Sequence, residues 1–243
     1  MSLLLDGAGA LGIELAAAQL AQLDQLGAAL GEANKRVNLT GIKNPAKVET
    51  ELFLDSLTAA VPLLDRLRAG EAIRLVDVGA GAGIPGIPLK IAFPRLRLTL
   101  VESIGKKAAF LREVVEQLHL ADVVVLAERA EAAAREEAHR DGYGWATGRA
   151  LGSLPVVVEL CAPFLEPGGL LVAQRRGDLD AELLAATPAF SALKVWTRVP
   201  IPIHLTGLED GRGLVLGEKY APTPSKYPRR PGIAKKRPIG RGA

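Results

Sequence analysis

This sequence contains little cysteine, few aromatic residues and no long apolar run. Its 243 residues include one cysteine, Cys161, and 4% Phe, Trp and Tyr. A single cysteine excludes an internal disulfide and is compatible with a reducing compartment. Cys161 lies in the apolar segment VVVELCAPFL, which favours a small buried residue over a nucleophile. No segment approaches the roughly 18 consecutive apolar residues of a membrane-spanning helix.

Several kinds of catalytic site are also disfavoured. The three histidines, His119, His139 and His204, show no paired spacing, which argues against a metal centre. No serine lies in a G-x-S-x-G context, which argues against nucleophilic hydrolysis. The N-terminal segment MSLLLDGAGALGIEL lacks the basic residues that begin a signal peptide. We expect a cytoplasmic monomer that binds neither a membrane nor a metal ion.

Positive charge is concentrated at the C-terminal end of the chain. Residues 219–243 contain eight Lys and Arg and no acid, so the preceding residues carry a net charge of −5. Five prolines and three glycines in this segment predict an extended, weakly structured tail. One interpretation is that the tail binds a polyanion, because Lys and Arg displace condensed counterions from phosphates. The other is that the tail has no specific partner and only increases solubility.

Two helical patterns precede an alternating α/β region. Leucines recur at helical spacing within residues 13–36, and a second helical pattern begins after Pro45. Strand-like and helical segments then alternate, which predicts a parallel sheet covered by helices on both faces. The expected strands are 74–78, 96–102, 123–128, 144–150 and 169–176, and the expected helices are 85–93, 105–118, 130–140, 154–165 and 178–187.

The last two expected strands, 193–201 and 212–220, have no helix between them, so we expect an antiparallel hairpin at one edge. The sequence therefore predicts an α/β fold with a mostly parallel Rossmann-like sheet. Its parts are an N-terminal helical layer (1–68), a cofactor-binding domain (69–220) and a basic tail (221–243), together forming one compact unit.

A glycine-rich loop, GAGAGIPG at residues 79–86, directly follows the first expected strand. Ligands of parallel sheets bind at the carboxyl ends of strands, so the loop is correctly placed for one. Its glycines allow backbone amides to approach a ligand closely, and Pro85 suits the first turn of the next helix. Gly81, Gly83 and Gly86 also fit the G-x-G-x-x-G pattern of dinucleotide sites, which is a weak signal by itself.

Asp77, near the end of the first strand, favours a different cofactor. An acid there would disfavour a pyrophosphate but suit a cation, and the terminal hairpin departs from the ordinary dinucleotide-binding sheet. The acid and its glycines resemble the first motif of class I methyltransferases, whose cofactor S-adenosylmethionine carries a sulfonium, an ammonium and no phosphate. Glu102 ends the second strand, where a carboxylate can accept the ribose hydroxyls of either cofactor.

Taken together, several segments resemble the RsmG (GidB) family in order and spacing. They are NLTGIKNP, FLDSL, LVDVGAGAGIPGIPLKIAFP, LTLVESIGKKAAFLREV, GRALGSLP and the tail KYPRRPGIAKKRPIG. The family comprises bacterial methyltransferases that modify N7 of one guanine in 16S ribosomal RNA. The resemblance implies S-adenosylmethionine as cofactor, with contacts at Gly79, Ile84, Ala130, Glu131 and Arg149.

The chain departs from the family pattern at three places. Leu52 stands where the family usually has His, and Gly148 replaces a small hydroxyl residue before Arg149. Arg175 and Arg176 precede Gly177, where the family commonly has a single Lys before the Gly. A planar guanidinium binds phosphate differently from an ammonium. These departures concern contact details more than the reaction.

The resemblance also implies how the reaction would proceed. Guanine N7 has an in-plane lone pair, so no catalytic base is needed, and the rate would come from alignment of N7 with the methyl group. We expect Arg149 to position the extruded purine, by stacking, and Asp77 to favour the developing positive charge. Phosphates of the RNA would be bound by Arg175, Arg176, Arg229, Arg230, Lys235, Lys236 and Arg237.

Other functions remain compatible with parts of the sequence. A methyltransferase acting on another RNA, a protein or a small molecule would share the glycine loop without needing the basic tail. A nicotinamide oxidoreductase would have to place its phosphates near Asp77. A non-catalytic RNA-binding module would leave the glycine loop unexplained.

Overall fold

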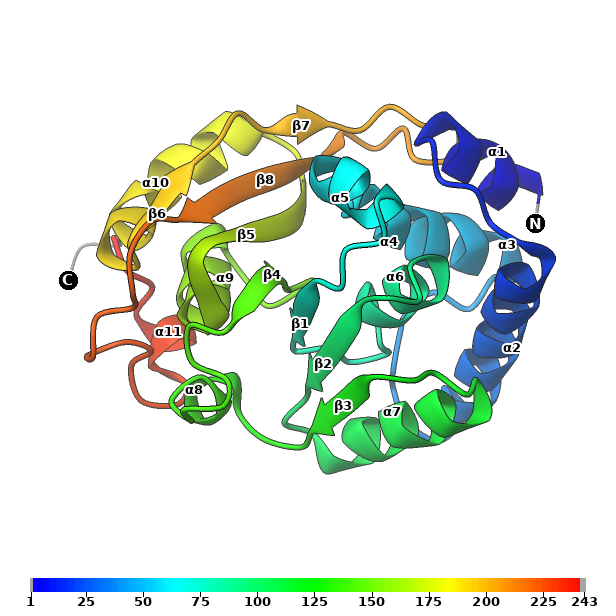
Figure 1. Ribbon diagram of the computed structural model, residues 1–243, viewed down its shortest axis with the longest axis horizontal. Coiled ribbons are helices and arrows are strands. Elements are labelled where there is room, and N and C mark those ends of the chain that lie inside the picture. The colour runs from blue at the N-terminus through cyan, green and yellow to red at the C-terminus, as the bar shows by residue number, and fades with distance from the viewer. Residues whose placement is uncertain (1, 241–243) are drawn as a thin grey trace.

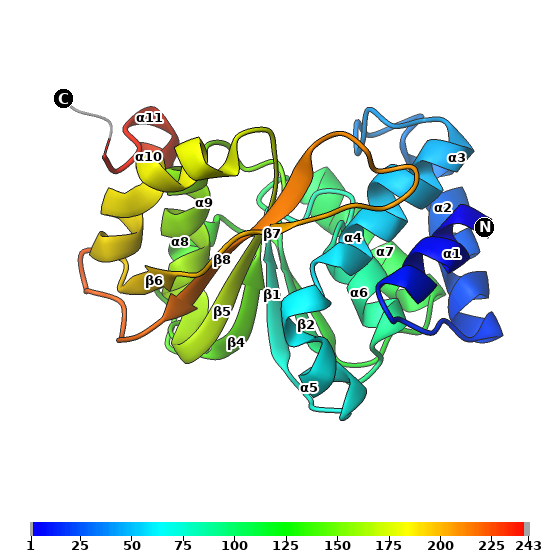
Figure 2. The same cartoon turned by 90° about the horizontal axis from the view of Figure 1, so that it is seen from above.

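The computed structural model describes residues 2–240, which form a sheet with helices packed on both faces (Figures 1 and 2). The eight strands run in the order β3-β2-β1-β4-β5-β8-β6, and β7 pairs with β8. Their bounds are β1 Arg74–Val78, β2 Arg97–Val101, β3 Val123–Leu126, β4 Tyr143–Thr147, β5 Leu165–Arg176, β6 Val195–Thr197, β7 Ile201–Pro202 and β8 Arg212–Lys219.

The pairing confirms the expected mostly parallel sheet with an antiparallel edge. Strands β1 to β5 pair in parallel, whereas β8 is antiparallel to β5, β6 and β7. The chain moves outward from β1 to β2 and β3 and then returns to β4 on the other side of β1. The carboxyl ends of β1 and β4 therefore border the point at which the strand order reverses, where ligands of such sheets bind.

Helices of the N-terminal layer and of the crossovers cover one face of the sheet. They are α1 Ser2–Ala10, α2 Ala17–Ala33, α3 Pro45–Lys47, the π-helix η1 Val48–Leu54, α4 Asp55–Thr58, η2 Val61–Leu63, α5 Leu64–Arg68, α6 Gly86–Ala92 and α7 Gly105–Gln117. The helical pattern expected after Pro45 thus exists, although its middle turns widen into a π-helix. Figure 2 shows this layer beside β1 and β2.

The other face is covered by α8 Ala130–Ala133, α9 Leu154–Cys161, η3 Ala162–Phe164, α10 Leu179–Ala192 and α11 Ile233–Lys236. Alternate strand residues divide between two apolar cores: Leu75 belongs to the first and Val76 to the second. Burial on both faces explains why the central strands are almost continuously apolar in sequence.

One expected helix is much shorter in the structure. A helix over 130–140 was expected, but α8 ends at Ala133 and turns follow as far as Asp141, whose φ is +47°. Arg140 in these turns donates to the carbonyl oxygens of Thr223 and Tyr227, at 2.9 and 3.0 Å. Contacts with the distant tail therefore fix this segment in a non-helical form.

Within residues 2–240, none of the helices has both the length and the apolarity that crossing a bilayer requires.

Candidate functional site

The glycine loop after β1 requires glycine for conformation and for space. Gly79, Gly81 and Gly83 have left-handed φ angles of +68°, +55° and +80°, which side chains rarely adopt. A Cβ on Gly79 would lie only 2.3 Å from Leu151 Cδ2. The loop is thereby held close to the segment after β4, and its backbone is free to form the wall of a cavity.

That cavity lies at the carboxyl ends of β1, β2 and β4 and has a volume of about 590 Å³. Its walls are the glycine loop, residues 39–42, residues 102–104 after β2 and residues 149–151 after β4. Four of the expected cofactor residues line it: Gly79, Ile84, Glu102 and Arg149. We call it the cofactor cavity.

Glu102 links two loops of the cofactor cavity. Its Oε2 accepts a hydrogen bond from the amide of Gly81 at 3.0 Å, and its Oε1 accepts from the amide of Ile104 at 2.7 Å. The side chain is buried. A carboxylate oxygen can accept more than one hydrogen bond, so both oxygens retain capacity for hydroxyl groups of a ligand.

Asp77 lies beneath the loop and does not line the cofactor cavity. It is fully buried, and its Oδ2 accepts from the amide of Gly86 at 2.9 Å, where α6 begins. Burial raises the pKa of Asp77 to about 7, although the Gly86 hydrogen bond and the charge of Arg149 oppose this. The side chain therefore anchors the loop from behind, and its expected effect on the developing positive charge stays a prediction.

Arg149 belongs to a buried network of charges. Its Nη2 lies 3.3 Å from Asp55 Oδ2 and donates to the carbonyl oxygen of Glu51 at 2.9 Å. The other oxygen of Asp55 lies 2.7 Å from Nη1 of Arg212. Burial lowers the pKa of Arg149, and the charge of Asp55 opposes that change. Asp55 thus fixes two guanidinium groups.

Asp55 and Arg212 were not expected from the sequence to have a role in the site. A signal for Asp55 does exist, because FLDSLTAA places one acid in an otherwise apolar helical run. A buried acid requires a partner, but the sequence does not say that its partners lie about 90 and 160 positions away.

Ala130 and Glu131 lie beside the cofactor cavity without lining it; the preceding Arg129 does line it. Glu131 is buried, and its Oε1 accepts from the amide of Gly232 at 2.8 Å. In this structure Glu131 therefore binds the C-terminal tail, and its expected contact with a cofactor stays a prediction.

The C-terminal tail is packed against the protein as far as residue 240, contrary to the extended form expected from its prolines and glycines. Arg229 forms an ion pair with the buried carboxylate of Glu159, with Nε to Oε1 at 2.8 Å. Lys219 is also buried and donates to the carbonyl oxygen of Ala162, and burial lowers its pKa to about 8. These ion pairs and hydrogen bonds hold the tail in place, although its own sequence has little preference for helix or strand.

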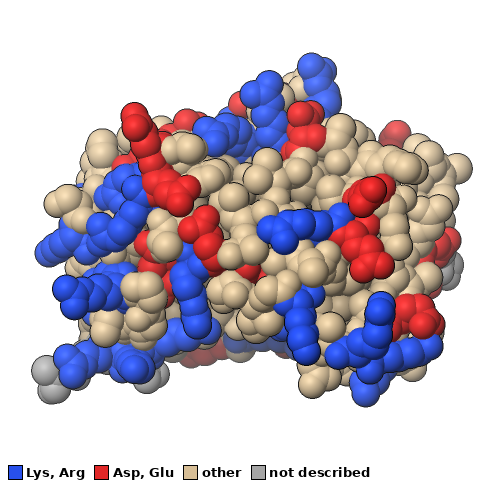
Figure 3. Space-filling model, turned by 90° about the horizontal axis from the view of Figure 1, so that it is seen from below, with Lys and Arg blue, Asp and Glu red and all other residues tan. Residues whose placement is uncertain are grey.

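The basic residues expected to bind RNA divide into two groups. Arg175 is paired with Glu182 through two hydrogen bonds of 2.6 Å, and Arg229 with Glu159, so both have structural roles. Arg176 is half-exposed and lies 3.2 Å from Asp210. The exposed members are Arg230, Lys235, Lys236 and Arg237. Figure 3 shows Lys and Arg gathered at the lower left of this face of the molecule.

Lys235, in α11, connects the tail with the cofactor cavity, because it lines that cavity. Residues 241–243, including Arg241 of the tail, lie outside the described residues.

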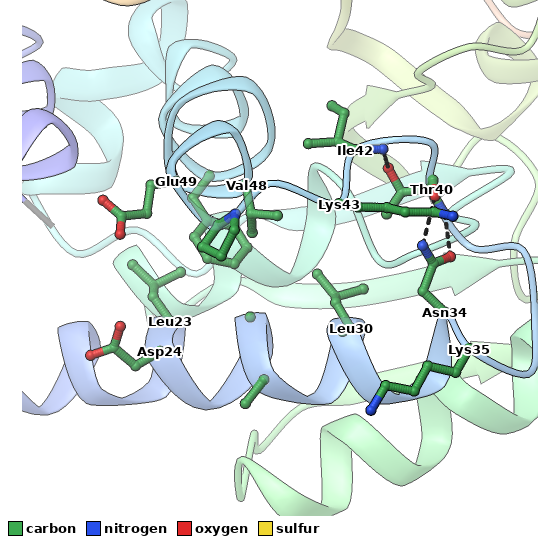
Figure 4. Close-up of a pocket in the computed structure, with 15 residues that line it drawn as sticks. Leu23, Asp24, Leu30, Asn34, Lys35, Thr40, Ile42, Lys43, Val48 and Glu49 are labelled. Carbon is green, nitrogen blue, oxygen red and sulfur yellow. Dashed lines mark hydrogen bonds between the residues drawn. The ribbon is translucent and has the colours of Figure 1, made fainter.

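Figure 4 shows another cavity, beside α2, whose wall includes Thr40, Ile42 and Lys43 of the segment 38–43. Asn34 pins this segment: its Oδ1 accepts from the amides of Leu39 and Thr40, and its Nδ2 donates to the carbonyl oxygen of Thr40. Thr40 and Ile42 line both cavities. The NLTGI motif therefore forms a shared wall whose position depends on α2.

The structure places two of the departures from the family pattern. Leu52 is buried and lines the cofactor cavity, in a place where a histidine would add polarity. A Cβ on Gly148 would lie 2.6 Å from Leu151 Cδ1 and 3.0 Å from Cys161 Sγ, so a side chain there would require Leu151 to move. Cys161 itself is buried, as expected, and burial raises its pKa.

With this geometry in place, comparison with known proteins identifies the family. Residues 19–200 match GidB, described as rRNA small subunit methyltransferase G. The chain belongs to the GidB family. A ribosomal RNA small subunit methyltransferase G from Dehalococcoides mccartyi strain CBDB1 is 40% identical over 98% of this chain and 100% of its own length. The corresponding protein of Roseiflexus castenholzii is 42% identical, over 94% of this chain and 95% of its own length.

Among solved structures, a mutant of MtNAS in complex with S-adenosylmethionine is similar in fold. Its TM-score is 0.51 at 15% identity, covering 84% of this chain and 72% of that chain. Membership of the GidB family makes this chain a methyltransferase and confirms the resemblance inferred from the motifs.

Proposed function

We propose that this protein transfers a methyl group from S-adenosylmethionine to N7 of a guanine in 16S ribosomal RNA. The observation that carries the proposal is the cofactor cavity, with Glu102 and a glycine loop at the carboxyl ends of β2 and β1, in a chain of the GidB family. Relatives named for methylation of small-subunit rRNA support the substrate.

The residues of the cofactor cavity fit S-adenosylmethionine. Glu102 can accept the ribose hydroxyls, and Ile84 and Ile104 offer apolar surface to the adenine. Lys107, Arg129 and Lys235 supply positive charge for the carboxylate of the methionyl part. A pyrophosphate fits less well, because the first amide of α6 is already bound by Asp77.

When bound, the cofactor supplies a methyl group on a positively charged sulfur. Because N7 of guanine carries an in-plane lone pair, no residue of the chain would have to remove a proton from the acceptor. The protein's contribution is to align the two reactants and exclude water, and effective molarities of well-oriented groups correspond to ~7–11 kcal/mol. Arg149, at the edge of the cavity, is the side chain best placed to hold the acceptor base.

Partners beyond the cofactor follow from the tail. Arg230, Lys235, Lys236 and Arg237 are exposed on it, and we assign them to RNA phosphates, together with Arg176. Arg175 and Arg229 act indirectly, through their ion pairs with Glu182 and Glu159. We also retain the expectation of a cytoplasmic monomer.

Calorimetric titration tests the cofactor, using S-adenosylmethionine and NAD separately, each with and without small ribosomal subunits. We expect binding of S-adenosylmethionine alone. The second step is incubation with labelled cofactor and either naked 16S rRNA or small subunits that lack base methylation, followed by mapping of 7-methylguanosine by mass spectrometry. Binding of NAD, or methylation of a different atom, would contradict the proposal.

A further inference from the structure

A second cavity adjoins the cofactor cavity. It has a volume of about 540 Å³ and shares Ile42, Arg149 and Ala150 with its neighbour. The remaining polar lining is Glu51, Asp55, Thr58, Gln174, Arg175, Arg176 and Arg212. Arg149 therefore stands at the junction of the two cavities, whereas Gln174 lies in the second alone.

Three of the side chains that line this second cavity each carry a buried polar atom that has no hydrogen-bond partner. Five such side-chain atoms occur among the described residues, and three belong to Arg149, Gln174 and Arg212. Nη1 of Arg212 lies in its ion pair with Asp55, so its charge is compensated. Two atoms remain without a partner: Nη1 of Arg149, which is a donor, and Oε1 of Gln174, which is an acceptor. Buried polar atoms are normally paired, so an unpaired donor and an unpaired acceptor on side chains that line a cavity are available to a ligand once those side chains turn towards it.

Both unpaired atoms are held in place through the same helix. Arg149 is bound by the carboxylate of Asp55, the first residue of α4. The amide nitrogen of Gln174 donates to the carbonyl oxygen of Asp55 and, at 3.1 Å, to Oγ1 of Thr58, the last residue of α4. Because its nitrogen is bound to a carbonyl oxygen, the orientation of the Gln174 amide is fixed, and its oxygen is the free atom.

We propose that the second cavity binds the acceptor guanine, with Nη1 of Arg149 donating to O6 and Oε1 of Gln174 accepting from N1–H. This inference rests on the proposed function. It replaces the stacking role expected for Arg149 with a contact in the plane of the base. O6 and N1–H lie on the Watson–Crick edge of guanine, and bases that are extruded for chemistry are commonly recognised through that edge.

The order of donor and acceptor selects guanine over adenine. N7 must point to the methyl group, in the cofactor cavity, and the substituent on C6 lies next to N7. In guanine that substituent is the acceptor O6, which the donor Arg149 at the junction can bind; in adenine it is the donor N6–H₂. N1 lies farther from N7, towards Gln174, and carries a hydrogen only in guanine. With adenine, Nη1 of Arg149 would therefore face the donor N6–H₂, and Oε1 of Gln174 would find no hydrogen on N1 to accept.

The test uses small subunits reconstituted with 16S rRNA in which the target guanine is replaced by inosine or by 2,6-diaminopurine. Inosine keeps O6 and N1–H, whereas diaminopurine has an amino group on C6 and no hydrogen on N1; both keep N7. We expect the wild-type protein to methylate inosine nearly as fast as guanine, and diaminopurine about 10- to 100-fold more slowly in kcat/KM. Equal rates for guanine and diaminopurine would overturn the inference, without requiring any variant to fold.

Gln174→Leu extends the test to the protein. We expect kcat/KM for guanine to fall about 10- to 100-fold, the preference for guanine over diaminopurine to shrink, and the dissociation constant of S-adenosylmethionine to stay unchanged. Leu184→Ala, an exposed position on α10, is the matched control. An unchanged preference in Gln174→Leu would refute the role of Gln174. If the wild-type protein binds S-adenosylmethionine but methylates no guanine, the proposed function itself fails.

Discussion

At the scale of single residues, Gly86 shows how closely the loop and the sheet are packed. A Cβ at this position would lie 2.8 Å from Leu100 Cδ2 and 2.9 Å from Asp77 Oδ2. We expect Gly86→Ala to lower the free energy of unfolding by about 1–3 kcal/mol through overpacking, as measured by urea denaturation. Gly105→Ala is the control, because that Cβ would meet nothing within 4 Å and Ala favours the helix. Equal stability of the two variants would contradict this packing.

Asp77, the partner of Gly86, should make stability depend on pH. Burial raises its pKa to about 7 from 3.8, so between these values the folded protein holds a proton that the unfolded chain has released. The contribution of this group is therefore present in full below about pH 4 and is lost as the pH rises to about 7. Asp77→Asn cannot ionise, and its stability relative to wild type should increase by ~1–4 kcal/mol across that interval. Parallel stability curves for the two proteins would show that the wild-type carboxyl is not perturbed.

The position of Asp77 also ranks two substitutions by their effect on the cofactor. An asparagine oxygen can still accept from the Gly86 amide, whereas alanine leaves that amide unpaired beneath the loop. We expect Asp77→Ala to weaken binding of S-adenosylmethionine about tenfold, and Asp77→Asn to weaken it much less, as measured by calorimetric titration. A direct electrostatic role would instead make the two variants equally weak.

The residues recognised from sequence and those missed differ in how far away their partners lie. Gly79 and Glu102 were recognisable because a glycine loop and a strand-end acid have local patterns. Asp55, Gln174 and Arg212 were not, because their roles arise only when α4, β5 and β8 meet. Asp77 was recognised as important, but its sequence position did not tell which side of the loop it would occupy.

At the scale of elements, the tail is held by carboxylates on α8 and α9. Glu159 is 1% exposed and binds both the side chain and the amide of Arg229. We expect Glu159→Gln to lower the free energy of unfolding by about 2 kcal/mol and to speed trypsin cleavage after the tail's Lys and Arg residues. Glu218→Gln is the control, since its partner Arg198 is largely exposed and such pairs contribute little. Cleavage at the wild-type rate in Glu159→Gln would mean that this ion pair does not hold the tail.

Elements were predictable where local pattern and tertiary environment agree. The first strand, 74–78, was predicted with its observed bounds, because a buried apolar run there ends at glycines. The helix expected over 130–140 was wrong beyond Ala133, since Arg140 is bound to the tail. The packing of the tail, which was expected to be extended and weakly structured, was missed for the same reason: its ion pairs and hydrogen bonds join segments 70 or more residues apart.

At the scale of the whole molecule, exposed positive charge lies on the tail at the ligand-binding edge of the sheet. We expect replacement of Arg230, Lys236 and Arg237 by Gln to reduce the slope of log K for RNA against log salt by about 2, because each phosphate contact contributes roughly 0.7–0.9. Lys235 is kept, so that the cofactor cavity is unchanged. Arg95→Gln with Arg97→Gln, near the amino end of β2, is the control and should leave the slope as it was. If the triple variant keeps the wild-type slope, the RNA binds to another surface of the protein.

Lys235 has a consequence for how the two ligands influence each other. It belongs to the tail that we propose to bind RNA and also to the wall of the cofactor cavity. By thermodynamic reciprocity, the factor by which RNA changes the affinity for the small ligand equals the factor by which the small ligand changes the affinity for RNA. A side chain common to both sites gives this factor a physical origin. If both proposed ligands bind, we expect the spent cofactor and the modified RNA to influence each other's release through Lys235.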